Sequence, residues 1–213
     1  ALARIGEPDN GIWEIRGEPQ MFTHSRVMIW AALDRAIQGA QTLGEDCETW
    51  IAARDSLRTE IETSAVSAAG FFTQSYGSAE VDASLLLLPQ VGFCEADDPR
   101  MLATVTQIEE TLMQDGLVNR YRTESGVDGL SGTENPFLAC SFWLVEQYAA
   151  TGRATDAEAL LDRLCALTND VGLLSEEYDL TNSRQVGNMP QAFSHLALVR
   201  AVDALSRAEH RSR

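Results

Sequence analysis

Residues 136–151, PFLACSFWLVEQYAAT, are apolar nearly all round when they are placed on a helix. A helix of this kind is buried inside a protein, because every face of it avoids water. The segment that follows, 155–168, is amphipathic, and Asp156 and Glu158 suit the positive N-terminal end of its helix dipole. A buried helix followed by a half-exposed one predicts a helical fold in two layers.

The same pairing recurs along the chain. The apolar periodicity predicts further helices over 23–43, 45–68, 81–90, 100–114 and 190–207. The run 81–90 is almost continuously apolar, so a short buried strand is the alternative there, although its neighbours favour a helix. No convincing strand pair is found. We therefore predict an all-α protein of alternating inner and outer helices, arranged as a toroid or solenoid.

The predicted connections alternate between short and long. The long ones are 69–79, 115–134 and 169–189, and in an alternating toroid they all lie at one end. Long loops on a rigid helical scaffold are where binding sites are usually built. These loops and the N-terminal segment carry aromatic rings beside carboxylates and arginines, which suits a sugar pocket. The residues concerned are Trp13, Glu14, Arg16, Phe72, Tyr76, Arg120, Tyr121, Arg122, Glu176, Glu177 and Tyr178.

The loop 172–179, GLLSEEYD, holds adjacent carboxylates that a chain reversal does not require, although a solvated acidic loop is the alternative. Two carboxylates on opposite walls of a pocket can hydrolyse a glycosidic bond, one as general acid and one as general base. Apolar neighbours in the sequence would exclude water from the Glu14 carboxyl group, as a general acid requires. The alternative is that Glu14 is a surface carboxylate paired with Arg16. Glu176 has a more polar setting that suits a base. We predict a separation of roughly 6.5–9.5 Å between the two carboxyl groups.

Composition excludes several classes of protein. The chain of 213 residues is 45% hydrophobic, enough for a sizeable core, and its net charge of −16 disfavours nucleic acid and anionic membranes as partners. No signal peptide or membrane-spanning run is found, which predicts a cytoplasmic location. The four cysteines form no CxxC pair and the histidines lack metal-ligand spacing. Reduced thiols are favoured over disulfides, and neither a metal nor a cofactor is predicted.

Several segments together resemble one family. They are GIWEIRG (11–17), MFTHSRVMIWAALDRAI (21–37), DASLLLLPQVGF (82–93), DGLSGTENPFLACSFWLVEQYAATGR (128–153) and GLLSEEYDLTNSRQVGNMPQAFSHLALV (172–199). The chain resembles glycoside hydrolase family 15, the bacterial glucoamylase-like and trehalase-like enzymes, over essentially its whole length. The resemblance implies an (α/α)6 toroid that inverts the anomeric centre of an α-linked glucose oligosaccharide or disaccharide.

The resemblance also implies roles for five residues. Glu14 falls on the general acid, and Glu176, the first carboxylate of SEEYD, falls on the general base. Arg120, in NRY, resembles an arginine that holds substrate hydroxyls, and Trp13 and Glu177 resemble residues of the pocket wall. An exo-acting glucoamylase that releases glucose is the leading hypothesis, trehalose hydrolysis is the alternative within the family, and a non-catalytic helical fragment is the alternative outside it.

One expected segment has no counterpart here. Family members carry a tryptophan-arginine-aspartate substrate-binding segment well before the acid, and nothing like it occurs in this sequence. About seven helices are predicted, which is fewer than a closed toroid needs. We therefore expect residues 1–213 to be the C-terminal portion of the catalytic domain, about half of the toroid, with the N-terminal half as its missing partner.

Overall fold

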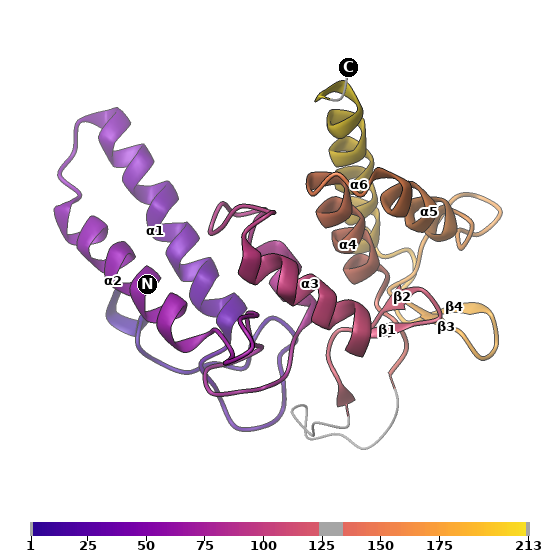
Figure 1. The fold of residues 1–213 in the computed structure, drawn as a ribbon, viewed down its shortest axis with the longest axis horizontal. Helices are drawn as coiled ribbons and strands as arrows, with labels where there is room; N and C mark the ends of the chain where they lie inside the picture. Colours follow the sequence, from indigo (N-terminus) through magenta and orange to yellow (C-terminus); the bar gives the residue numbers. More distant parts are fainter. Residues whose placement is uncertain (1, 124–133, 212–213) are drawn as a thin grey trace. The chain divides into compact units, whose positions relative to one another are not determined.

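A computed structural model describes residues 2–123 and 134–211 of the chain (Figure 1). These residues fold as two compact units, the first made of 2–104 with 123 and the second of 105–122 with 134–211. The α-helices described are α1 (Thr23–Leu43), α2 (Glu48–Ser64), α3 (Pro99–Thr111), α4 (Leu138–Ala150), α5 (Ala154–Cys165) and α6 (Ala192–Arg211). Two short 3-10 helices, η1 (Leu2–Arg4) and η2 (Ala83–Leu87), complete the helical elements of the described chain.

The predicted all-α class is confirmed, with every α-helix near its predicted position. In the first unit α1 and α2 lie side by side as an antiparallel hairpin (Figure 1). Gly44 ends α1 in the left-handed conformation, with φ of 71°, and its N–H caps the carbonyl groups of Ala40 and Gln41. Ile37, Ala40 and Cys47 are buried between the two helices.

The prediction of a regular helix over 81–90 was wrong about the type of helix. The apolar run forms only the five-residue 3-10 helix η2. Asp82 caps its start by accepting from the N–H of Ser84, and the N–H of Leu88 bonds to the Leu85 carbonyl. Pro89 has no N–H to donate to that carbonyl, so an α-helical turn cannot continue there. The run is nevertheless buried as predicted, with Leu85, Leu86 and Leu88 at most 1% exposed.

The second unit is built around α4. All of its residues from Leu138 to Ala149 are buried, which confirms the prediction from the apolar segment 136–151. α5 and α6 both pack against α4 (Figure 1). Phe193 of α6 contributes edge-to-face ring contacts to Phe137 and to Trp143 of α4. The alternation of a buried helix with half-exposed ones is therefore present in this unit.

The prediction that the chain contains no strand pairs was wrong. β1 (Met113–Gln114) pairs antiparallel with β2 (Leu117–Val118), and β3 (Glu177–Asp179) pairs antiparallel with β4 (Arg184–Val186). Both pairs are two-stranded hairpins of two or three residues, too short for an alternating apolar pattern to be read in the sequence. In the second hairpin Glu177 lies opposite Val186, so the predicted catalytic loop is an ordered ribbon.

All four cysteines are free thiols, as predicted, although only Cys47 and Cys140 are buried. The Nε2 of His195 accepts from the N–H of Leu174. The buried Nε2 of His24, by contrast, has no hydrogen-bond partner within the described residues. In the part of the chain that is described, no helix is long and apolar enough to cross a membrane, and no group of side chains suits a metal ion.

Candidate active site

The segment carrying Glu14 is a closed loop of the first unit. Asp9 and Gln20 form an antiparallel bridge at its base, with N–H to carbonyl distances of 2.9 and 2.8 Å in the two directions. Inside the loop the side-chain amide of Asn10 donates to the carbonyl of Ile15 at 2.7 Å, and the Asn10 carbonyl accepts from the N–H of Ile15. These bonds fix the loop without regular secondary structure.

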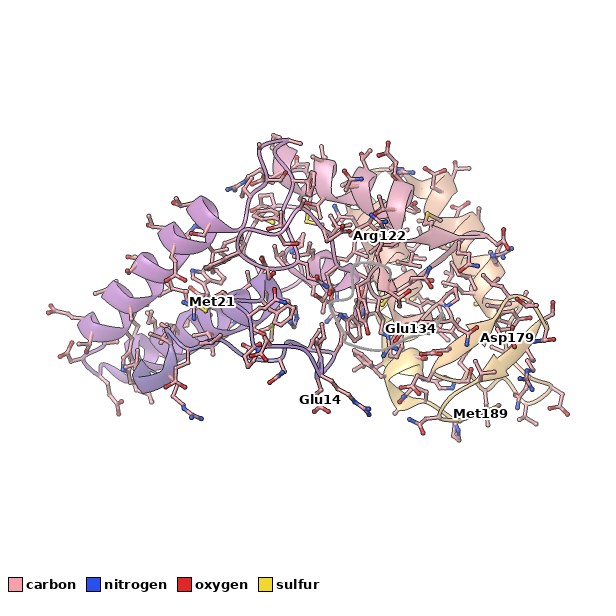
Figure 2. The ribbon with its side chains drawn as sticks, turned by 90° about the horizontal axis from the view of Figure 1, so that it is seen from below. Glu14, Met21, Arg122, Glu134, Asp179 and Met189 are labelled. Atoms are coloured by element: carbon pink, nitrogen blue, oxygen red, sulfur yellow. The ribbon has the colours of Figure 1, made fainter. Side chains whose placement is uncertain are left out.

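Glu14 stands at the turn of this loop with a φ of 51°. This left-handed conformation is uncommon for residues other than glycine, and it is often a mark of functional sites. The turn buries Ile15, which is 3% exposed, and leaves Glu14 exposed (Figure 2). The expectation that apolar neighbours desolvate Glu14 is therefore wrong for the described residues, because adjacent side chains point in different directions around a left-handed turn.

Trp13 is held by a buried carboxylate of its own unit. Its indole Nε1 lies 3.1 and 3.0 Å from the two carboxylate oxygens of Asp82. The same carboxylate accepts from the side-chain amide of Gln74 at 3.0 Å and from the N–H of Ser84 at 2.7 Å. Trp13, the residue before Glu14, is thus hydrogen-bonded to the first residue of the apolar segment that begins at Asp82.

Glu176 occupies the second unit, just before β3. Its N–H donates to the carbonyl of Asn188, and its own carbonyl accepts from the N–H of Leu138 at the start of α4, both at 3.0 Å. Its Oε2 accepts from both the N–H and the side-chain amide of Asn188, each at 3.2 Å. The backbone and the carboxylate are therefore both oriented, and the side chain is only partly buried.

Arg120 joins Glu177 to a second carboxylate. Its guanidinium contacts Glu134 through two nitrogens, at 2.7 and 3.1 Å, and contacts Glu177 Oε1 at 3.3 Å. The hydroxyl of Tyr121 donates to Glu134, and the guanidinium also lies 5.5 Å from the ring centre of Phe137. Burial raises the pKa of Glu177, a shift that Arg120 and a hydrogen bond from Asn135 partly oppose.

The hairpin that presents these carboxylates is tied to the helices by buried polar bonds. Gln185 of β4 accepts from the N–H of Ser175, and its amide donates to the carbonyls of Leu167 and Leu173. Ser194 of α6, which is fully buried, donates to the carbonyl of Ser175 at 2.8 Å. In Figure 2, Asp179 at the end of β3 and Met189 after β4 mark the course of this ribbon. Gln185 and Ser194 therefore hold the residue that directly precedes Glu176.

Comparison with known proteins assigns the family. Residues 3–203 match the family model of the Glycosyl hydrolases family 15. The chain belongs to this family. It is 46% identical over 211 residues to a protein of Mycobacterium tuberculosis named trehalase, covering 98% of this chain and 31% of that one. This chain therefore spans about a third of the length of that relative.

Solved structures of the family type share the fold. A structure titled "Glycosidase Wild Type" matches with a TM-score of 0.81 at 20% identity, covering 96% of this chain and 57% of that one. A bacterial glucoamylase complexed with acarbose matches with a TM-score of 0.71 at 18% identity, covering 93% of this chain and 35% of that one. These likenesses confirm the glucoamylase-type (α/α)6 class, of which the chain covers a part.

Within this family 15 chain, the predicted residues divide between the two units. Glu176, Glu177 and Arg120 belong to the second unit, where Arg120 contacts Glu177 directly. Glu14 and Trp13 belong to the first unit. The roles of all five residues, and the separation expected between Glu14 and Glu176, stay predictions. Part of the predicted loop 115–134, residues 124–133, lies outside the described residues.

Three polar residues near the predicted ones were missed by the sequence reasoning. Glu134 pairs with Arg120, Asn188 bonds to Glu176, and Asp82 bonds to Trp13. Asp82 had a recognisable signal, since a carboxylate at the edge of an apolar run is buried with it and must find donors. Glu134 and Asn188 had no such signal, because their partners come together only through the folding of loops.

Proposed function

We propose that this chain forms part of the (α/α)6 catalytic domain of an enzyme that hydrolyses trehalose. The sequence identity of 46%, over nearly the whole chain, to a protein named trehalase carries this proposal. Hydrolysis by a glucoamylase, the leading hypothesis from the sequence, becomes the second candidate, supported by the fold of the glucoamylase structure at 18% identity. The proposed domain covers residues 1–213 as a C-terminal portion of the toroid. The cytoplasmic location stays a prediction from the sequence.

In the proposed reaction Glu14 is the general acid and Glu176 the general base. Glu14 gives its proton to the glycosidic oxygen as the bond from that oxygen to one anomeric carbon breaks. A water molecule attacks the same carbon from the opposite face, and Glu176 takes the proton that the water loses. The anomeric centre is inverted, so trehalose yields one α-glucose and one β-glucose.

The hydrogen bonds of Glu176 support its assignment as the base. Asn188 engages only Oε2. Within the residues that the structure describes, Oε1 has no hydrogen-bond partner, which leaves it available to accept a proton from water. A base needs a fixed carboxylate with one oxygen accessible to the nucleophile.

Arg120, Glu177 and Trp13 are proposed to bind the sugar. A guanidinium and a carboxylate can bond neighbouring hydroxyl groups, and an indole offers an apolar face to the sugar ring. Because Glu134 and Glu177 both contact Arg120, its guanidinium is oriented before a substrate binds. Such preorganisation reduces the entropy lost on binding.

The experiment is an assay of glucose release from trehalose, maltose and maltotetraose. It should use the 213-residue chain and also a chain of the relatives' length that contains it. Proton NMR during the first turnovers distinguishes the anomers, and equal initial amounts of α- and β-glucose from trehalose are expected. Two α-glucose molecules would show retention and would contradict the proposed pair.

Variants distinguish the candidate functions. Glu14→Gln and Glu176→Gln should each lower kcat by about 10²- to 10⁴-fold, whereas Glu158→Gln, an exposed site on α5, is the matched control and should not. Faster release from maltotetraose than from trehalose would favour the glucoamylase. Inactivity of both lengths of chain on all three sugars would favour the non-catalytic fragment.

A further inference from the structure

Asp82 is a buried carboxylate whose hydrogen-bond partners in the described part of the chain are all uncharged. It is 3% exposed, and its two oxygens accept from the indole of Trp13, the amide of Gln74 and the N–H of Ser84. No ion pair of Asp82 occurs within the described residues. Burial of a carboxylate without a cation is costly unless hydrogen bonds satisfy its oxygens.

Packing and capping alone do not require this charge. The bond from Ser84 is an ordinary cap of η2, and a neutral asparagine caps a helix about as well as aspartate does. The distinctive feature is the indole of Trp13, whose N–H lies at 3.0 to 3.1 Å from both carboxylate oxygens. Hydrogen bonds to an ionised acceptor are roughly twice as strong as neutral ones. A charged acceptor therefore strengthens the contact with Trp13, as it does the bonds from Gln74 and Ser84.

Trp13 is the residue that directly precedes Glu14 in the strained turn. On the other side of Glu14, Ile15 is buried and bonded to Asn10 in both directions. The backbone at Glu14 is therefore anchored before and after the left-handed residue. A left-handed conformation at a non-glycine residue persists only where the surroundings enforce it. The Trp13 contact is one of these two anchors, and it bridges 69 positions of the sequence.

We propose that Asp82 is a positioning residue for the general acid. Through the indole of Trp13 it holds the turn that presents the Glu14 carboxyl group to the glycosidic oxygen. This inference rests on the proposed function of Glu14, and it adds a residue outside the acid loop to the machinery of proton donation. Asp82 itself touches neither the substrate nor the reacting atoms.

A double-mutant cycle with Asp82→Asn and Trp13→Phe tests the inference, in the length of chain that hydrolyses trehalose. Asparagine retains an acceptor for Ser84, and phenylalanine retains a ring but lacks the N–H. Asp82→Asn alone should lower kcat about tenfold or more, because small displacements of a catalytic group are costly, with KM changed less than kcat. In the Trp13→Phe background the same change should cost less than about twofold, since the bond is already absent. Equal losses in both backgrounds would overturn the proposal.

A matched control separates positioning from general damage to the fold. Gln74→Leu removes another hydrogen bond of Asp82 without touching Trp13. Its kcat should stay near the wild-type value. A loss as large as that of Asp82→Asn would show that Asp82 acts through the packing of its own segment, and the proposal would be wrong.

A spectroscopic measurement tests the contact independently of activity. The chain has four tryptophans, and the indole N–H signal of Trp13 in a ¹⁵N-correlated NMR spectrum is the one lost in Trp13→Phe. Asp82→Asn should move this signal upfield, while the signal of Trp30, whose buried Nε1 has no hydrogen-bond partner among the described residues, should not move. An unmoved Trp13 signal would contradict the contact on which the proposal depends.

The proposed role of Glu14 as general acid and the proposed positioning role of Asp82 can be refuted separately. Full activity of Glu14→Gln would remove the proposed acid and with it the basis of the positioning role. If Glu14→Gln is inactive but Asp82→Asn retains wild-type kcat, the assigned reaction stands and the role of Asp82 is refuted.

Discussion

Asn188 binds one oxygen of Glu176 twice, once through its backbone N–H and once through its side-chain amide. Asn188 also accepts from the N–H of Glu176, so the two residues are joined by three hydrogen bonds just outside the strand pair β3–β4. The backbone bonds belong to the fold, whereas the amide bond depends on the identity of residue 188. The proposed base is thus oriented by both the backbone and the exposed side chain of Asn188.

Asn188→Ala should lower kcat about tenfold, with a small change in KM. The variant keeps the backbone bonds, including the N–H bond to Oε2, but loses the amide bond that helps to fix the carboxylate. Misorientation of a base slows proton transfer more than it weakens binding. Steady-state kinetics on trehalose measure the effect. Asn182→Ala is the matched control, because Asn182 is an exposed amide of the same hairpin that bonds to Asp179. A similar loss in both variants would indicate general loosening of the hairpin.

Gly187→Ala should abolish most activity for two reasons. The added methyl group would contact Glu176, and alanine is strained in the left-handed backbone conformation of residue 187. Gly187 has φ of +79°, and a Cβ there would lie 2.8 Å from Oε2 of Glu176. Gly172 has φ of +77° with nothing within 4 Å of the same position. Both alanine variants should lose about 1–2 kcal/mol of unfolding free energy from the left-handed backbone.

Comparison of the two glycine variants isolates the contact with Glu176. Only Gly187→Ala should lower kcat, by more than about tenfold, because only there must the proposed base be displaced. Thermal unfolding and kinetics are measured on both proteins. Equal kcat values in the two variants would show that Glu176 adjusts without consequence, which would argue against a tightly placed base.

Glu134→Gln should weaken substrate binding through Arg120. The change removes the charge that faces the guanidinium at two of its nitrogens, and Arg120 is then oriented chiefly by Glu177. We expect KM for trehalose to rise about tenfold and kcat to fall less, because the loss concerns positioning of a binding group. Tyr121→Phe removes one neutral bond to Glu134 and should change KM less than about threefold. An unchanged KM in Glu134→Gln would separate Arg120 from sugar binding.

Glu177 should make stability fall as pH rises above about 4.5. Burial raises its pKa above the ordinary value of 4.5, so the folded state binds the proton more tightly than the unfolded state. Where the folded state holds more protons, the free energy of unfolding decreases with pH, and the decrease ends above the raised pKa. Arg120, Glu134, Glu176 and Asn135 face this group, and Arg120 and Asn135 reduce the shift.

Urea unfolding at several pH values from about 4 to 7 tests this dependence. Relative to Glu177→Gln, wild type should lose stability as pH rises through that window. Glu158→Gln, at an exposed position, should follow wild type. A wild-type protein that gains stability relative to Glu177→Gln over the same range would show that Arg120 outweighs the desolvation.

Thiol reactivity should separate Cys165 from the other three cysteines. Cys165 is exposed, whereas Cys47 and Cys140 are buried. Burial raises the pKa of the Cys94 thiol to about 12, so almost no thiolate is present there at pH 8. The thiolate is the reactive form, and one fast-reacting thiol in the native protein is expected from a colorimetric thiol reagent. Cys165→Ser should remove the fast phase, and its persistence would contradict the assignment.

The sequence was most informative where local pattern and burial agree. The apolar segment 136–151 predicted α4, because burial on every face of a helix follows from the residue types themselves. The pattern was misleading at 81–90, since an apolar run reports burial but not hydrogen-bond geometry, and Pro89 limits the run to a 3-10 turn. The hairpin β3–β4 was missed because three-residue strands give no periodic signal.

The sequence by itself determined the helical class, because apolar residues at helical spacing encode it, and its resemblance to family 15 pointed to the family and to the residues proposed for catalysis. Only the tertiary structure decided which side chains support them. Asp82 reaches Trp13 across 69 positions, and Asn188 reaches Glu176 across 12, through loops whose course no local pattern specifies. The exposure of Glu14 was likewise decided by a left-handed turn. Hydrogen bonds between distant loops depend on the folded backbone, so composition and periodicity cannot reveal them.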